Sequence, residues 1–258
     1  MELLIGLTVP LTGTILGAAT VFLVRDKLSN IANKAMLGFA SGVMVAACFW
    51  SLLQPALEQT GDGTLKETWP VIAGFVAGML FLLALDTFIP HQHIEDSEAE
   101  GPRSALPRST KMMLAVALHN IPEGMAVGVV FAGLADGSSA LSFAGALALA
   151  IGMAVQNIPE GAIISMPLRN EGNSRTKAFA WGAVSGLVEP IAASATILFL
   201  GGNVAAMPLL LSFAAGAMLY VVIEELIPSS QSGEHSNIGT IGFACGFVLM
   251  MVLDSTVG

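Results

Sequence analysis

The sequence predicts an all-α integral membrane protein with eight transmembrane helices. Of its 258 residues, 54% are hydrophobic and only 11% are charged, whereas soluble domains carry about 25% charged residues. The mean hydropathy is +0.76. Apolar runs recur along the whole chain and are long enough to cross a bilayer, for which a helix needs about 20 residues.

The eight expected spans are separated by short loops, apart from one longer polar segment. The spans are residues 2–24, 34–54, 69–90, 110–134, 141–168, 177–200, 205–228 and 237–257. We therefore expect a single transmembrane domain covering residues 1–258. The polar segment at 91–109 carries histidine and acidic residues and is expected to be a loop.

Basic residues are concentrated in alternate loops. Nine of the ten Lys and Arg residues flank the first, third and fifth loops: Arg25, Lys27, Lys34, Arg103, Arg108, Lys111, Arg169, Arg175 and Lys177. Basic residues mark cytoplasmic loops in membrane proteins. The 91–109 loop is therefore predicted to be cytoplasmic, and both termini are predicted to lie outside. The first residues, MELLIGL, have no basic segment, so we expect no cleaved signal peptide.

Short motifs recur in the two ends of the chain in the same order. GFVAGMLFLLALD at 74–86 matches GFACGFVLMMVLD at 242–254, FASGVM at 39–44 matches FAAGAM at 213–218, and Gly6-Leu7-x-x-Pro10 matches Gly186-Leu187-x-x-Pro190. Spans 1–3 thus correspond to spans 6–8. The displacement is five spans, an odd number, so the halves have opposite topology. This predicts a 3+2+3 inverted repeat, an arrangement typical of secondary transporters.

One polar hexapeptide occurs in both central spans, 4 and 5, which are antiparallel. Residues 119–124 read HNIPEG and residues 156–161 read QNIPEG. In each copy the first residue and the glutamate are four residues apart, so they share one face of a helix. The proline of each copy removes a helical hydrogen bond and frees a carbonyl oxygen beside that face. Both spans therefore carry a polar face in mid-membrane.

Ionisable groups at membrane depth are costly and usually line a pathway or face one another. Glu123 and Glu160 alone would repel each other, whereas a divalent cation would neutralise both. Imidazole with oxygen donors suits a first-row transition metal. Glu189, just before Pro190 in span 6, adds a third carboxylate. A structural role explains a lone histidine or asparagine, but it explains poorly two copies of the motif and a third glutamate.

On these motifs the chain resembles the ZIP (Zrt/Irt-like) family of divalent metal transporters, most closely its bacterial GufA-like branch. The resemblance implies a metal site between spans 4 and 5, completed by span 6. Its residues would be His119, Asn120, Glu123, Gln156, Asn157, Glu160 and Glu189. Many members have histidine at the position of Gln156, and some have aspartate at that of Asn157. We therefore expect a site richer in oxygen donors here.

The resemblance also implies how such a protein works. The substrate would be Zn²⁺, with Fe²⁺, Mn²⁺ and Cd²⁺ as related substrates, moving toward the cytoplasm across the cytoplasmic (inner) membrane. Spans 1, 4, 5 and 6 would move against spans 2, 3, 7 and 8 in an elevator-like manner, in a homodimer. We expect no cofactor besides the transported metal.

A second polar group lies on the expected cytoplasmic side. His91 and His93 follow span 3, and Glu224 and Glu225 lie near the end of span 7. These residues could form an exit-side metal site. They could equally be a solvated loop and water-exposed carboxylates, and the sequence leaves both interpretations open.

Two Gly-x-x-x-Gly pairs, in spans 3 and 8, indicate close helix packing. The pairs are Gly74 with Gly78 and Gly242 with Gly246. Such pairs serve packing within one chain or between two copies, and their sequence does not distinguish the two.

The sequence as a whole therefore predicts a metal transporter and not an enzyme. One alternative is an intramembrane metal-dependent hydrolase, in which bound Zn²⁺ would activate water. Another is a metal-sensing or structural membrane protein that carries no metal flux. The chain has no H-E-x-x-H motif, and its predicted donors are numerous and weak, which suits release. The net charge of −9 argues against nucleic-acid binding. The expected partners are metal ions, the lipid bilayer and a second copy of the chain.

Overall fold

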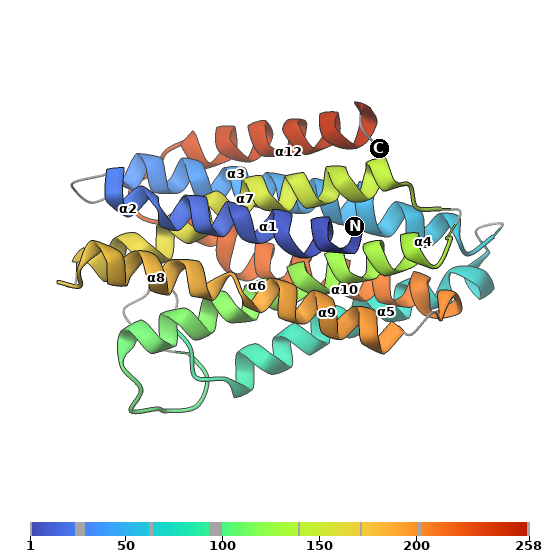
Figure 1. Cartoon of the computed structure of the whole chain (residues 1–258), viewed down its shortest axis with the longest axis horizontal. Coiled ribbons are helices and arrows are strands. Elements are labelled where there is room, and N and C mark those ends of the chain that lie inside the picture. Colours follow the sequence, from blue (N-terminus) through green and yellow to red (C-terminus); the bar gives the residue numbers. More distant parts are fainter. Residues whose placement is uncertain are drawn as a thin grey trace.

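The computed structural model is a bundle of long helices (Figure 1). It describes residues 2–23, 29–61, 64–92, 100–138, 140–170, 172–200 and 203–256. Within these ranges the chain forms no β-strand, and the single extended pairing is one bridge between His91 and Glu100.

The elements follow one another along the chain without any sheet. They are α1 (Glu2–Ala18), α2 (Thr20–Leu23), α3 (Asn30–Ala47), the π-helix η1 (Cys48–Leu53), α4 (Gln54–Glu58), α5 (Leu65–Phe88), α6 (Arg108–Ala135), α7 (Phe143–Asn170), α8 (Arg175–Ser185), α9 (Val188–Leu200), the 3-10 helix η2 (Val204–Ala206), α10 (Met207–Val221), the π-helix η3 (Val222–Leu226), α11 (Ile227–Gln231) and α12 (Ile238–Thr256).

Joined end to end, these elements give eight helical segments of membrane-spanning length and hydropathy in the described part of the chain. They are Glu2–Leu23, Asn30–Glu58, Leu65–Phe88, Thr110–Ala135, Phe143–Asn170, Arg175–Leu200, Met207–Gln231 and Ile238–Thr256. The predicted all-α fold with eight spans is confirmed, and the boundaries differ by only a few residues. Because eight is even, both termini lie toward the same end of the bundle (Figure 1).

The outer helices present apolar side chains where a bilayer would lie. α5 exposes Leu80 and Leu83, and α12 exposes Ile241 and Val248. Such contiguous apolar exposure is unusual on soluble proteins. These faces are therefore suited to contact lipid.

The spans pack in two groups of four. In the first, α1 packs on α7 and α6 packs on α9, and contacts of α1 with α6, α8 and α9 join these two pairs. In the second, α3 packs on α12 and α5 packs on α10, and contacts of η1 and α4 with α10, and of α3 with η3 and α11, join these two pairs. The α1–α6–α7–α9 group thus contains spans 1, 4, 5 and 6, and the α3–α5–α10–α12 group contains spans 2, 3, 7 and 8. The main contacts between the groups run from α6 to α10 and from α3 to α7.

Glycines allow the closest of these approaches. A Cβ at Gly78 of α5 would collide with the carbonyl oxygen of Phe213 in α10, and a Cβ at Gly246 of α12 would collide with that of Phe39 in α3. The other glycine of each pair makes a similar contact with the same partner helix. Both Gly-x-x-x-Gly pairs therefore serve packing within the chain.

These two contacts involve matching positions of the predicted repeat. Gly78 corresponds to Gly246, and Phe213 corresponds to Phe39, in the motif alignment of the two halves. The two π-helices, η1 and η3, also interrupt corresponding spans, 2 and 7. The matched features support an inverted repeat, which stays a prediction.

Candidate metal centre

The two hexapeptides lie inside continuous helices that pass through their prolines. HNIPEG belongs to α6 and QNIPEG to α7, and neither helix ends at Pro122 or Pro159. Span 6 behaves differently, because α8 stops at Ser185 and α9 starts at Val188. Glu189 therefore lies in the first turn of α9, directly after a break in its span.

The seven residues predicted to bind metal are all buried. Their exposed fractions are 9% or less: His119, Asn120, Glu123, Gln156, Asn157, Glu160 and Glu189. Buried carboxylates need compensation by donors or by a cation. The structure shows how much of that compensation the chain itself supplies.

Glu189 receives donors from three different spans. Asn157 Nδ2 donates to Glu189 Oε2 at 2.8 Å, and Thr14 Oγ1 donates to Glu189 Oε1 at 3.1 Å. Asn120 Nδ2 donates to the carbonyl oxygen of Ser185 at 3.2 Å and lies 3.5 Å from Glu189 Oε1. One carboxylate thus joins α1, α6 and α7 to the start of α9.

Gln156 connects the two hexapeptides directly. Its Nε2 donates to Glu123 Oε1 at 2.8 Å and lies 3.5 Å from Asn157 Oδ1. The carboxyl groups of Glu123 and Glu160 are close enough to form a hydrogen bond if one of them is protonated. Two ionised carboxylates this close require a cation between them or a shared proton.

Four side-chain oxygens in this network are buried and have no hydrogen-bond partner within the described residues. They are Asn120 Oδ1, Glu123 Oε2, Gln156 Oε1 and Glu160 Oε2. Buried polar atoms nearly always have a partner. All four are acceptors, and two belong to carboxylates, so a divalent cation would satisfy them. The site thus offers oxygen ligands to a metal ion. This agrees with the presence of Gln156 at the position where many ZIP family members have histidine.

His119 contacts a residue outside this set of seven. Its Nε2 contacts Glu225 Oε2 in η3 of span 7. Glu225 was expected on the exit side, so the two predicted groups meet at this contact. A pocket lies beside it, lined by Leu82, Asp86, Leu118, His119, Tyr220, Val221, Glu224 and Glu225.

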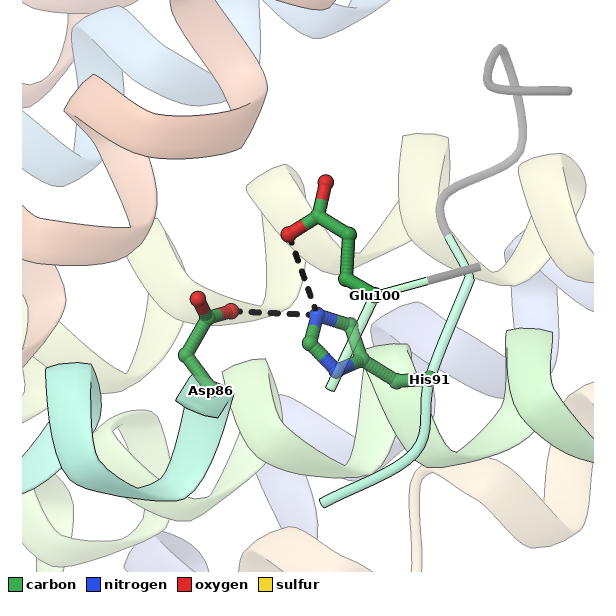
Figure 2. Close-up of side chains that lie close together, drawn as sticks. All are labelled: Asp86, His91 and Glu100. Carbon is green, nitrogen blue, oxygen red and sulfur yellow. Dashed lines mark ion pairs between the residues drawn. The ribbon is translucent and has the colours of Figure 1, made fainter. Parts of the chain in front are cut away.

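The pocket continues toward a second polar cluster at the start of the 91–109 loop. The buried imidazole of His91 has Nε2 3.0 Å from Asp86 Oδ1 and 3.9 Å from Glu100 Oε2 (Figure 2). Its Nδ1 lies 2.8 Å from the carbonyl oxygen of Ile89. The ligand atoms of Asp86, His91 and Glu100 all lie within 4.8 Å of one another, so they could share one metal ion. His93, the other predicted loop histidine, lies outside the described residues.

Thr14 is the main site residue that the sequence reasoning missed. It lies four residues after Pro10 in α1, and so on the same helix face. The carbonyl oxygen of Pro10 is 3.4 Å from Asn157 Nδ2. A proline that recurs in the repeat, followed one turn later by a hydroxyl, was a usable signal. The carbonyl oxygen of Ser185 left no signal, because any residue provides one.

Comparison with known proteins finds relatives that match nearly the whole chain. The family model described as ZIP Zinc transporter matches residues 90–254. The zinc transporter ZIPB of Bordetella bronchiseptica is 37% identical over 249 residues, which cover 95% of this chain and 78% of ZIPB. The zinc transporter GufA of Myxococcus xanthus is 38% identical over 255 residues, covering 96% and 95%. The human zinc transporter ZIP11 is 31% identical over 325 residues, covering 95% and 94%. This chain therefore belongs to the ZIP family.

Proposed function

We infer that this chain is a zinc transporter. Its substrate binds at a site between α6 and α7, and α9 completes that site. The observation that carries this conclusion is the group of buried, unpartnered oxygens on the two hexapeptides. The similar bacterial and human proteins are named zinc transporters. Fe²⁺ and Mn²⁺ are further candidate substrates, because an oxygen-rich site suits harder cations as well. Cd²⁺ is a candidate by the family resemblance alone.

The chemistry of binding follows from the donors. A Zn²⁺ ion that enters the site loses water, and protein oxygens replace that water. Glu123 and Glu160 supply the neutralising charges, while Asn120 and Gln156 supply neutral oxygens. The metal set retains all seven predicted residues. Among them, Asn157 and Glu189 also hold the site together through the hydrogen bond between them.

The packing of the spans suggests how the site is moved. All the residues of this set lie on α6, α7 and α9, within one group of four spans. We propose that the α1–α6–α7–α9 group moves against the α3–α5–α10–α12 group and carries the metal with it. The dense contacts inside each group support rigid-body motion of this kind.

The path on the exit side is proposed to run along the second polar cluster. From His119 it passes Glu225 and Glu224 and reaches Asp86 and His91, with His93 further along the loop. We propose that this end faces the cytoplasm, that both termini face the periplasm and that transport runs inward across the inner membrane. A homodimer is also proposed, by resemblance alone.

A metal-dependent hydrolase is the weaker alternative. The relatives that cover most of this chain are named transporters, and ZIP transporters are not enzymes. No specific observation favours hydrolysis, so we propose transport.

The test is metal uptake into proteoliposomes that contain a fluorescent chelator. Zn²⁺, Fe²⁺, Mn²⁺ and Cd²⁺ are compared for wild type and for Glu123→Ala/Glu160→Ala. The control variant is Glu2→Ala/Glu234→Ala, which removes two exposed carboxylates outside the site. Uptake is expected to disappear in the site variant and to persist in the control. Normal uptake in the site variant would refute the site, and metal binding without any uptake would refute transport.

A further inference from the structure

His119 is the one imidazole among the seven predicted metal residues, and it contacts a residue outside that set. Its Nε2 contacts Glu225 Oε2. The oxygens that a metal would join belong to Asn120, Glu123, Gln156 and Glu160. The imidazole Nε2 cannot bind a metal beside those oxygens while it holds Glu225.

The contact joins the two groups of spans. His119 lies on α6, which packs on α9, whereas Glu225 lies on η3, which packs on α3, α10 and α11. A π-helix inserts an extra residue into a turn and often occurs at a functional site. η3 is such an insertion in span 7, directly after α10. The pair therefore links the group that carries the site to the group against which it is proposed to move.

We propose that Glu225 is a positioning residue that competes with the transported metal for His119. This inference rests on the function proposed above and adds a step to it. In the empty transporter, Glu225 holds His119 and ties the two groups together. When the metal binds, His119 turns to it and releases Glu225. Loading of the site then removes a contact that opposes movement.

If Glu225 competes for His119, removing Glu225 should change the metal affinity in the opposite direction to that expected for a metal ligand. If Glu225 binds the transported metal or merely attracts it, its removal weakens metal binding. If Glu225 competes for His119, its removal strengthens binding, because the metal no longer has to break the contact. The sign of the change therefore distinguishes the roles.

Glu224 provides a charge-matched control. It is the neighbour of Glu225 in η3, is exposed and lines the same pocket, while the contact to His119 is made by Glu225. Glu224→Ala removes the same charge from nearly the same place but keeps the contact between Glu225 and His119. Because Glu224 lies on the proposed exit path, this variant is expected to weaken Zn²⁺ binding slightly and not to strengthen it. Glu225→Gln removes the charge but keeps an oxygen that accepts from His119.

The experiment is a Zn²⁺ titration of the purified full-length chain in detergent, by competition with a fluorescent chelator. Glu225→Ala is expected to bind Zn²⁺ about tenfold more tightly than wild type, the effect of losing one hydrogen bond to a charged group. Glu225→Gln is expected to stay close to wild type. Improved binding cannot result from misfolding.

A double-mutant cycle shows whether the effect acts through His119. In a His119→Ala background, Glu225→Ala is expected to leave the Zn²⁺ affinity unchanged. Weaker or unaltered binding by the single Glu225→Ala variant would overturn the proposal, as would tighter binding that persists without His119. Whether the metal binds at the proposed site at all is tested separately, by the Glu123→Ala/Glu160→Ala variant.

Discussion

At the scale of single residues, the carboxylate held by hydrogen bonds and the carboxylates with unpartnered oxygens belong to different residues of the candidate site. Glu189 is surrounded by donors from Asn157, Thr14 and Asn120. Glu123 and Glu160 each keep an oxygen without a partner in the described structure. These hydrogen bonds therefore link the helices around Glu189, while the remaining acceptors are available to the proposed substrate.

Thr14 tests whether donors to Glu189 hold the site in place. Its hydroxyl comes from α1 and carries no charge, so removing it changes the hydrogen bonding of Glu189 without changing the charge of the site. Thr14→Val keeps the shape of the side chain but removes the donor to Glu189. Losing the nearer of the two donors to Glu189 Oε1 costs about 1–3 kcal/mol, because Asn120 Nδ2, at 3.5 Å, is the one that remains. We expect the KM for Zn²⁺ uptake to rise several-fold, with a smaller change in kcat.

Thr8→Val is the matched control in the same helix, since its hydroxyl donates to its own backbone at Leu4. Uptake by Thr8→Val should equal that of wild type. Equal KM values for the two variants would show that Thr14 does not hold Glu189.

The candidate site residues can be picked out from the sequence because they are polar residues in apolar spans, and the structure buries all seven of them. Their partners cannot be picked out in this way. The sequence places His119 and Glu123 on one face of a helix, but it does not say that His119 reaches across to Glu225. That contact depends on the packing of α6 beside span 7, which is a tertiary property.

At the scale of elements, spans 2, 3, 7 and 8 are joined by close backbone contacts. Gly42 of α3 packs against the carbonyl oxygen of Phe243, and Gly216 of α10 packs against that of Phe75. Without apolar driving force inside a bilayer, helices associate through close packing of small residues. The apolar runs predicted the spans well. They did not predict η1, η3 or the break before Glu189, because hydropathy does not register one extra residue in a turn.

Alanine at the closest glycine contacts should weaken this packing. Gly78→Ala and Gly246→Ala each place a methyl group against a backbone carbonyl that cannot move away easily. Overpacking of this kind costs about 1–3 kcal/mol. We expect a lower Tm of the detergent-purified protein for both variants, by thermal unfolding. Ala77→Leu, on the exposed face of α5, should leave the Tm unchanged, and a similar loss there would point to a general sensitivity of α5.

At the scale of the whole molecule, two groups of spans meet at two places, where α6 contacts α10 and where α3 contacts α7. The same two sets of spans follow from the family resemblance, and the packing supports them independently. The motifs predicted an inverted repeat because they recur in order, and the matched glycine contacts support it. The geometry of the repeat lies beyond the sequence, because it depends on how complete spans are placed, whereas the basic loops do predict the sides of the membrane.

If the two groups slide past each other, a covalent link between them must stop transport, whereas a link within one group must not. Gly133 of α6 lies against the side chain of Met207 of α10, across the boundary. Phe81 of α5 and Phe213 of α10 lie inside one group, with ring centroids 5.4 Å apart. Cysteine pairs at these two places, in a chain with Cys48→Ala and Cys245→Ala, can be joined by a short reducible bis-thiol reagent.

We expect the Gly133→Cys/Met207→Cys variant to lose Zn²⁺ uptake when it is cross-linked and to regain it after reduction. Cross-linked Phe81→Cys/Phe213→Cys should keep transporting, because α5 and α10 are expected to move together or not at all. Continued uptake with the first pair fully joined would mean that α6 does not shift against α10. The metal would then have to pass through a static path beside His119 and Glu225, and the separation into two moving groups would be wrong.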